Sequence, residues 1–143
     1  MANSFADQVG AWVAESKKRT VAVLQESTKE VVTRAQRPVK QGGSMPVVTG
    51  NLRNSLIVAL NGNRVGKGAE SYINAIPLMK AGDEIFIGWT AKYARRMEYG
   101  FHGTDKLGRT YDQQGYGFLR LATQKWPQIV RDTARSFERV FRT

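Results

Sequence analysis

Residues 5–37 read FADQVGAWVAESKKRTVAVLQESTKEVVTRAQR, and the spacing of their apolar side chains is the strongest structural signal in the chain. Apolar or small residues recur in it at steps of three and four, which places them along one side of an α-helix. They are Phe5, Val9, Trp12, Val13, Ser16, Thr20, Leu24, Val31 and Ala35. Ser4 or Asn3 can cap the start, and Pro38 ends the helix because proline lacks a backbone N–H. The pattern predicts a long helix over residues 1–37.

A helix of this length would run roughly 50 Å, since each residue adds about 1.5 Å. The whole chain has 143 residues, which is the size of a single domain with one core. So small a body cannot cover such a helix along its full length. We therefore expect the apolar side of the helix to complete its burial against another subunit or a partner.

Two strands are predicted in the middle of the chain, over residues 55–60 and 83–89. Both are rich in branched or aromatic side chains, and turn-forming residues flank them. Residues 64–82 are ambiguous. We favour a loop with a helical turn there, and a short helix over residues 69–79, broken at Pro77, is the alternative.

A short helix is predicted over residues 91–99, with Thr90 as its cap and Gly100 at its end. Its inner side carries Tyr93, Ala94 and Met97, and its outer side carries Arg95, Arg96 and Glu98. Residues 101–117 contain many glycines and are expected to form a loop, which in a compact domain is usually functional or mobile.

The last predicted element is a helix over residues 118–143, with its own apolar stripe. Pro127 falls inside it, and a proline there removes one hydrogen bond and its ring pushes on the preceding turn. We expect a kink or a restart near Trp126.

These elements predict an α+β fold in which a long N-terminal helix and a kinked C-terminal helix pack on a small, mainly antiparallel sheet. The chain is expected to be one domain over residues 1–143. Its parts are a long helix (1–37), a loop (38–48), a body of strands and short helices (49–100), a second loop (101–117) and a C-terminal helix (118–143). Two strands alone are marginal, so we expect a third within residues 64–80 or 109–117, or from a neighbouring subunit.

The composition is strongly basic, with a formal net charge of +10. The excess is spread along the whole chain and not gathered in a tail. Such a field favours polyanions such as DNA. Solubility, or complementarity to an acidic protein neighbour, explains it equally well.

Several classes of chemistry find no support in the residues. The chain has no cysteine, which excludes disulfides and thiolate metal sites. His102 is its single histidine, so no second imidazole can join it as a metal ligand or a catalytic base. No nucleotide-binding glycine motif is present. We expect no cofactor, no metal and no enzymatic activity. The N-terminus lacks a signal-peptide core and no window is long and apolar enough for a membrane span, so we expect assembly in the cytoplasm.

Three blocks of sequence resemble one known family. Residues 49–56, TGNLRNSL, are similar to a "TGxLRxSI" segment of small tailed-phage tail-component or neck proteins. Ile87-Gly88, Tyr93-Ala94 and the residues 97–100, MEYG, resemble their "vG…YA…vEfG" block. Residues 117–122, GFLRLA, match their "pFLrpA" entry to the last helix, with Gly117 where the family often has proline.

The resemblance implies a structural virion protein without catalytic residues. Such proteins form rings of six or twelve copies at the head–tail junction, as neck or tail-completion subunits. Their neighbours are connector or stopper proteins and tail terminator or tail-tube proteins, and the genomic DNA passes through the ring. A tail terminator ring and a basic DNA-binding module are the alternatives for this chain.

Six arginines are candidates for contact with DNA or with a neighbouring subunit, because the guanidinium group can donate two parallel hydrogen bonds to a phosphate or carboxylate. They are Arg53, Arg95, Arg96, Arg131, Arg135 and Arg139, and the last three form one ridge with Arg142 at steps of four, four and three. For each of them a solvated surface position is the simpler alternative. The expected packing anchors, in the core or at an interface, are Trp12, Trp89, Tyr93 and Trp126.

Overall fold

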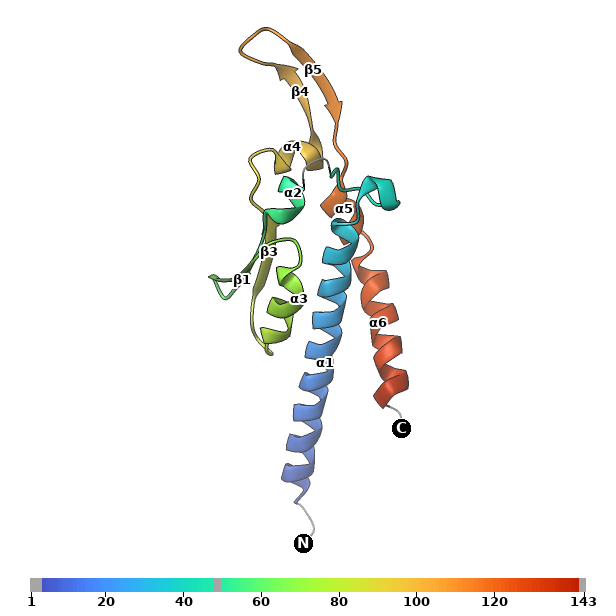
Figure 1. Ribbon diagram of the computed structural model, residues 1–143. Helices are drawn as coiled ribbons and strands as arrows, with labels where there is room; N and C mark the ends of the chain where they lie inside the picture. Colours follow the sequence, from blue (N-terminus) through green and yellow to red (C-terminus); the bar gives the residue numbers. More distant parts are fainter. Residues whose placement is uncertain (1–3, 48–49, 142–143) are drawn as a thin grey trace.

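A computed structural model describes residues 4–47 and 50–141 of the chain and shows the predicted α+β class (Figure 1). Helix α1 (Phe5–Ala35) begins with a capping box, in which Asp7 N–H donates to Ser4 Oγ at 3.1 Å and Ser4 N–H donates to the Asp7 carboxylate at 3.4 Å. The alternative cap Asn3 lies outside the described residues. A short 3₁₀ turn η1 (Val39–Gln41) follows.

The sheet has three antiparallel strands in the order β2-β1-β3. They are β1 (Leu56–Leu60), β2 (Asn63–Lys67) and β3 (Ile85–Trp89). Strand β2 supplies the third strand that the sequence required, at the start of the ambiguous segment. The rest of that segment folds as the short helix α3 (Ser71–Ala75) and the 3₁₀ turn η2 (Ile76–Leu78), which contains Pro77.

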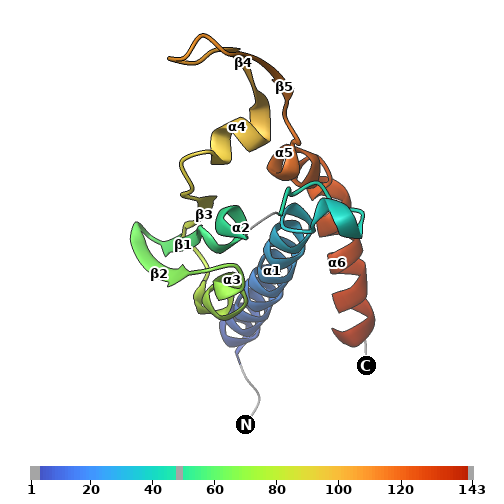
Figure 2. The same ribbon diagram turned by 45° about the horizontal axis from the view of Figure 1, so that its top comes forward.

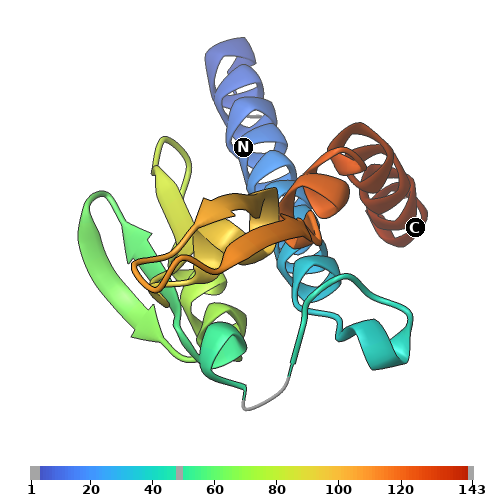
Figure 3. The ribbon, with the colours of Figure 1, turned by 90° about the horizontal axis from the view of Figure 1, so that it is seen from above.

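The C-terminal part of α1 is the centre of the fold. On one side Val32 packs with Leu56 and Val58 of β1 and with α3. On the other side Val31 and Ala35 pack with the C-terminal helices. Seen from above, the sheet and the C-terminal helix α6 lie on opposite sides of α1 (Figure 3).

The C-terminal helix is split as predicted. Helix α5 (Phe118–Thr123) ends, and α6 (Trp126–Phe141) restarts at Trp126. Pro127 therefore sits in the first turn of α6, where a helix does not need the missing N–H. Figure 2 shows α6 running alongside α1.

The predicted loop at residues 101–117 is wrong. Residues 100–114 form a hairpin of β4 (Gly100–Thr104) and β5 (Thr110–Gln114), which projects from the body at the end opposite the N-terminus (Figure 1). The Phe101 and Tyr111 rings lie 5.9 Å apart, and such a cross-strand pair stabilises a ladder despite the glycines.

The short helix before the hairpin also differs from the prediction. Helix α4 (Ala94–Tyr99) begins three residues late, and Thr90 does not cap it. The Thr90 hydroxyl instead donates to the Ser55 carbonyl, at the start of β1. Among the described residues, no helix combines the length and hydropathy needed to cross a membrane.

Candidate interaction surfaces

Glu98 joins the two downstream motif blocks. Its side chain is only 8% exposed, and its carboxylate accepts the backbone N–H groups of Leu119 and Arg120, each at 2.8 Å. The carboxylate thereby caps α5, whose first backbone N–H groups have no partner within the helix. The expectation that Glu98 points outward from α4 is therefore wrong, because the start of α5 recruits it.

The backbone segments that contain Gly100 and Gly115 pass very close to each other at the base of the hairpin. A Cβ atom on Gly100 would lie 2.6 Å from the Gly115 nitrogen, and one on Gly115 would lie 2.6 Å from the Gly100 nitrogen. Gly100 also has a φ of +86°, a conformation that other residues adopt only with strain. Only glycine at both positions allows the two chain segments to pass so closely.

The first motif block packs beside α4 and the start of α5, where the other two blocks meet. Helix α2 (Asn51–Asn54) buries Leu52 against Met45 and Phe118, in a cluster completed by residues of β3 and α4. The Trp89 and Phe118 rings meet edge to face at 5.3 Å. Residues from all three blocks thus pack in one region, although Thr49 itself lies outside the described residues.

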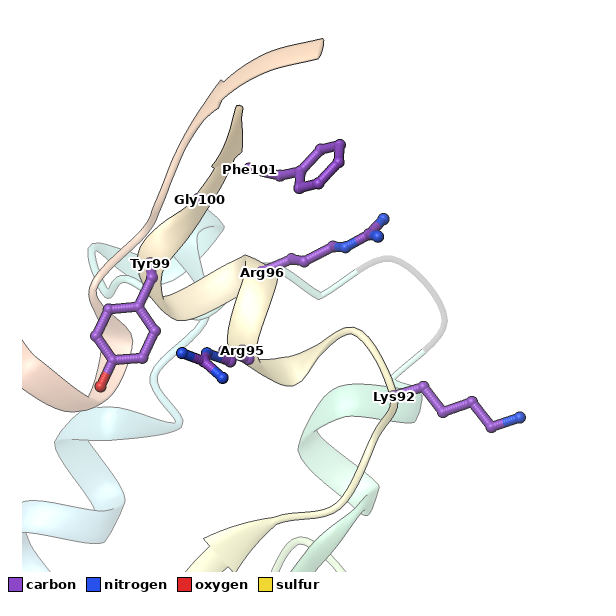
Figure 4. Close-up of a pocket in the computed structure, with 6 residues that line it drawn as sticks. All are labelled: Lys92, Arg95, Arg96, Tyr99, Gly100 and Phe101. Atoms are coloured by element: carbon purple, nitrogen blue, oxygen red, sulfur yellow. The ribbon is translucent and has the colours of Figure 1, made fainter. Parts of the chain in front are cut away.

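Arg95 and Arg96 border a surface hollow on α4, which we call the basic pocket (Figure 4). It is lined by Lys92, Arg95, Arg96, Tyr99, Gly100 and Phe101. The Arg96 guanidinium lies 4.1 Å from the centre of the Phe101 ring, a cation–π contact that orients it. Within the described part of the chain, none of these three cations forms an ion pair.

The arginine ridge on α6 is exposed. Arg131, Arg135 and Arg139 follow one another along the helix, and Arg131 also donates to the Pro127 carbonyl at 3.3 Å. Arg142, the fourth member of the predicted ridge, lies outside the described residues.

Arg53 lies neither in the basic pocket nor on the arginine ridge. It is half-buried on α2, and its Nε has no hydrogen-bond partner among the described residues.

A groove between α1 and α6, which no pattern in the sequence predicted, is lined mainly by acidic charges. We call it the acidic groove, and it is lined by Glu26, Glu30, Arg34, Ile129, Asp132, Thr133, Ser136 and Phe137. Arg34 is paired with Glu30 at 2.8 Å, which leaves Glu26 and Asp132 as exposed carboxylates. The residues of the groove come from segments about a hundred positions apart, so no local pattern indicates it.

The predicted anchors fall into two groups. Trp89 and Trp126 pack in the core clusters. Tyr93 is at the surface, and Trp12 is 70% exposed. Beside Trp12 stand Phe5, at 81% exposed, and Val9 and Val13, which are also exposed. We call these four residues the exposed stripe, and every residue of α1 that is fully buried lies beyond it, from Ser27 onward.

Among the described residues, no three His, Asp or Glu side chains come close enough to hold a metal ion. His102 pairs with Asp112 across the hairpin. At the hairpin turn, partial burial acts to raise the pKa of Asp105. The hydrogen bonds from Arg109, Leu107 and Tyr111 outweigh it, so the pKa is lowered. The pKa of Asp83 is lowered by hydrogen bonds from the Asn61 side chain and the Lys80 backbone.

Comparison with protein-family models, with curated proteins and with solved structures finds no match to this chain. The family resemblance therefore depends on the three motif blocks alone.

Proposed function

We propose that this chain is a structural subunit of a tailed-phage particle that forms a ring at the head–tail junction. In this role it is a neck or tail-completion protein, joins the head connector to the tail and surrounds the DNA channel. The role has no catalytic step and needs no cofactor.

The exposed stripe carries the proposal. Phe5 and Trp12 leave most of their surface in water, although burying a large apolar side chain is worth about 2–3 kcal/mol. Contiguous exposed apolar surface of this kind usually marks an interaction site. Copies of the same chain would cover the stripe in a ring, which is the assembly that the motif blocks imply.

The packing of the motif blocks is a second support. Leu52, Glu98 and Phe118 each come from a different block, and they meet where α2, α4 and α5 join. Because these residues pack against one another, the distances between them along the chain are constrained, and a constrained spacing is what a family motif reflects.

The direct test is the mass of the purified full chain, measured by native mass spectrometry or sedimentation. We expect a closed ring of six or twelve copies. Trp12→Ser should lower its formation, and Phe86→Ser should not, since Phe86 is an exposed aromatic residue on the sheet and not on α1. A wild-type chain that stays monomeric at high concentration would contradict the proposal.

The position in the particle needs a separate measurement. We expect mass spectrometry of purified phage particles to find the chain at ring stoichiometry. Binding to a connector or stopper protein would favour a neck role, and binding only to the tail tube would favour a tail terminator.

A basic DNA-binding module is the second candidate, because the arginine ridge is exposed along α6. If three arginines each neutralise a phosphate, the slope of log affinity against log salt should shrink by about three when all three become alanine. A slope unaffected by these changes would argue against this candidate.

A further inference from the structure

We propose that the basic pocket of one copy binds the acidic groove of a second copy, so that each contact in the ring joins two different surfaces. The inference depends on the proposed ring and names the contact that closes it.

The basic pocket has the properties of a carboxylate-binding surface. Three cations, Lys92, Arg95 and Arg96, line it without an acidic residue among its lining side chains. Arg96 is already held against Phe101, so less side-chain freedom is lost when it binds. Tyr99, which is 72% exposed, adds apolar surface at the edge.

The acidic groove is a local exception in a basic chain. The chain has 22 basic and 12 acidic residues, whereas three carboxylates and one arginine line the groove. Glu26 and Asp132 face solvent, and Ile129 and Phe137 give the groove an apolar part. Among the described residues neither Glu26 nor Asp132 forms an ion pair, although Asp132 accepts a hydrogen bond from the Gln128 side-chain amide at 2.9 Å. Both surfaces therefore combine charge that has no ion-pair partner with apolar area, and their charges are opposite.

The two surfaces lie on different elements, the basic pocket on α4 and the acidic groove between α1 and α6. A contact between unlike surfaces of identical chains is heterologous, and it forms a ring when the repeated rotation closes after a whole number of copies. A contact between like surfaces would stop at a dimer. The charge pattern thus fits a ring.

DNA phosphate is the other ligand that the basic pocket could take. The acidic groove favours a protein contact, because it supplies a matching partner that the chain itself carries. The arginine ridge remains available to phosphate on a different surface.

Reciprocal charge reversal tests the contact. Arg95→Glu/Arg96→Glu makes the basic pocket acidic, and Glu26→Lys/Asp132→Lys makes the acidic groove basic. We expect each variant alone to associate about tenfold more weakly or worse, because like charges then face each other. An equal mixture of the two should recover the ring, since the acidic pocket of one variant matches the basic groove of the other in strict alternation.

Matched controls change the same charge elsewhere. Arg64→Glu/Lys67→Glu on β2 and Glu70→Lys/Glu84→Lys near the sheet alter exposed residues and should assemble like the wild type. Circular dichroism of every variant should match the wild type, which separates lost contact from lost fold.

The outcomes distinguish the two proposals. A monomeric wild type overturns the ring itself. A ring that both reversed variants still form, or a mixture that fails to recover it, overturns the contact proposed here alone. Reversed-pocket rings that assemble normally but lose affinity for duplex DNA would assign the basic pocket to phosphate instead.

Discussion

The indole N–H of Trp89 donates to the side-chain oxygen of Gln36 at 3.1 Å, at a position where Gln36 is only 2% exposed. The Gln36 amide in turn donates to the Ala69 carbonyl at 2.7 Å. These two bonds connect β3, the end of α1 and the segment before α3. A buried polar group that loses its hydrogen-bond partner lowers the stability of the fold, so we expect substitutions at Trp89 to be destabilising.

Trp89→Phe keeps an aromatic ring but removes the donor. We expect a loss of roughly 1–3 kcal/mol in the free energy of unfolding, because the Gln36 oxygen loses its partner in a buried place. Trp12→Phe, on the exposed stripe, should change stability by less than about 0.5 kcal/mol. Urea denaturation of both variants measures the difference, and equal midpoints would refute the prediction.

Glu98→Gln retains the shape of the side chain and removes its charge. The single amide oxygen can accept only one of the two N–H groups of Leu119 and Arg120, and the amide NH2 group faces the other N–H group as a second donor. We expect a cost of about 1–3 kcal/mol. Glu138→Gln, on the exposed part of α6, serves as the comparison with the same chemical change. Thermal unfolding should separate the two, and a larger effect at Glu138 would contradict the capping role.

Gly100→Ala should disrupt the base of the hairpin. The positive φ alone costs roughly 1–3 kcal/mol for a residue with a Cβ, and the close Gly115 nitrogen adds a steric clash. Gly10→Ala is the control, since nothing lies within 4 Å of a Cβ there and alanine favours the helix by about 1 kcal/mol. Amide spectra should show altered β4 and β5 signals in the first variant and unchanged ones in the second.

The hairpin turn should loosen in acid. The folded pKa of Asp105 lies below its ordinary value of 3.8, so the carboxylate stabilises the turn at pH values above 3.8. This contribution is lost as the pH falls through the lowered folded pKa. We expect the amides of Leu107 and Arg109, which donate to Asp105, to lose protection from hydrogen exchange in that range. In Asp105→Asn the same amides should show no such pH dependence.

Assembly should protect the N-terminal half of α1. In an isolated subunit the amides of residues 5–20 are expected to exchange quickly, because almost all of these side chains are exposed. In the proposed ring the same amides should exchange more slowly, whereas those near Val31 and Val32, which are buried within the chain, should change little. Unchanged exchange over residues 5–20 would show that neighbours do not cover the exposed stripe.

Local patterns predicted α1 and the split C-terminal helix well, and the short helices less well. The stripe of α1 and the restart at Trp126 depend on spacing and on one proline, and both are features of adjacent residues. The favoured loop at 101–117 was wrong because its glycines suggest a loop, while cross-strand pairs such as Phe101 with Tyr111 stabilise a hairpin. Strand β5 does fall within residues 109–117, one of the ranges named for a further strand, but its partner β4 was not predicted. Glu98 was placed on the wrong side of α4 since its partners begin 21 residues later in the chain.

The candidate surfaces were predicted less completely. Arg95 and Arg96 were identified, but the aromatic ring that orients Arg96 belongs to the segment interpreted as a loop. The acidic groove depends on the packing of α6 beside α1, which no spacing within either helix could reveal.

Apart from its own strand pairing, the hairpin contacts mainly α4, and the crossing of Gly100 and Gly115 is its narrow attachment. Its length is therefore free to vary without repacking the core. Side chains alternate between the two faces of a strand, so adding or deleting one residue in each strand would move the side chains of the outer end to the opposite faces of the hairpin. Adding or deleting two residues in each strand would keep them on their present faces. The region around Leu107, at the far end, is accordingly the place to insert an epitope or a fluorescent label while the rest of the chain keeps its shape.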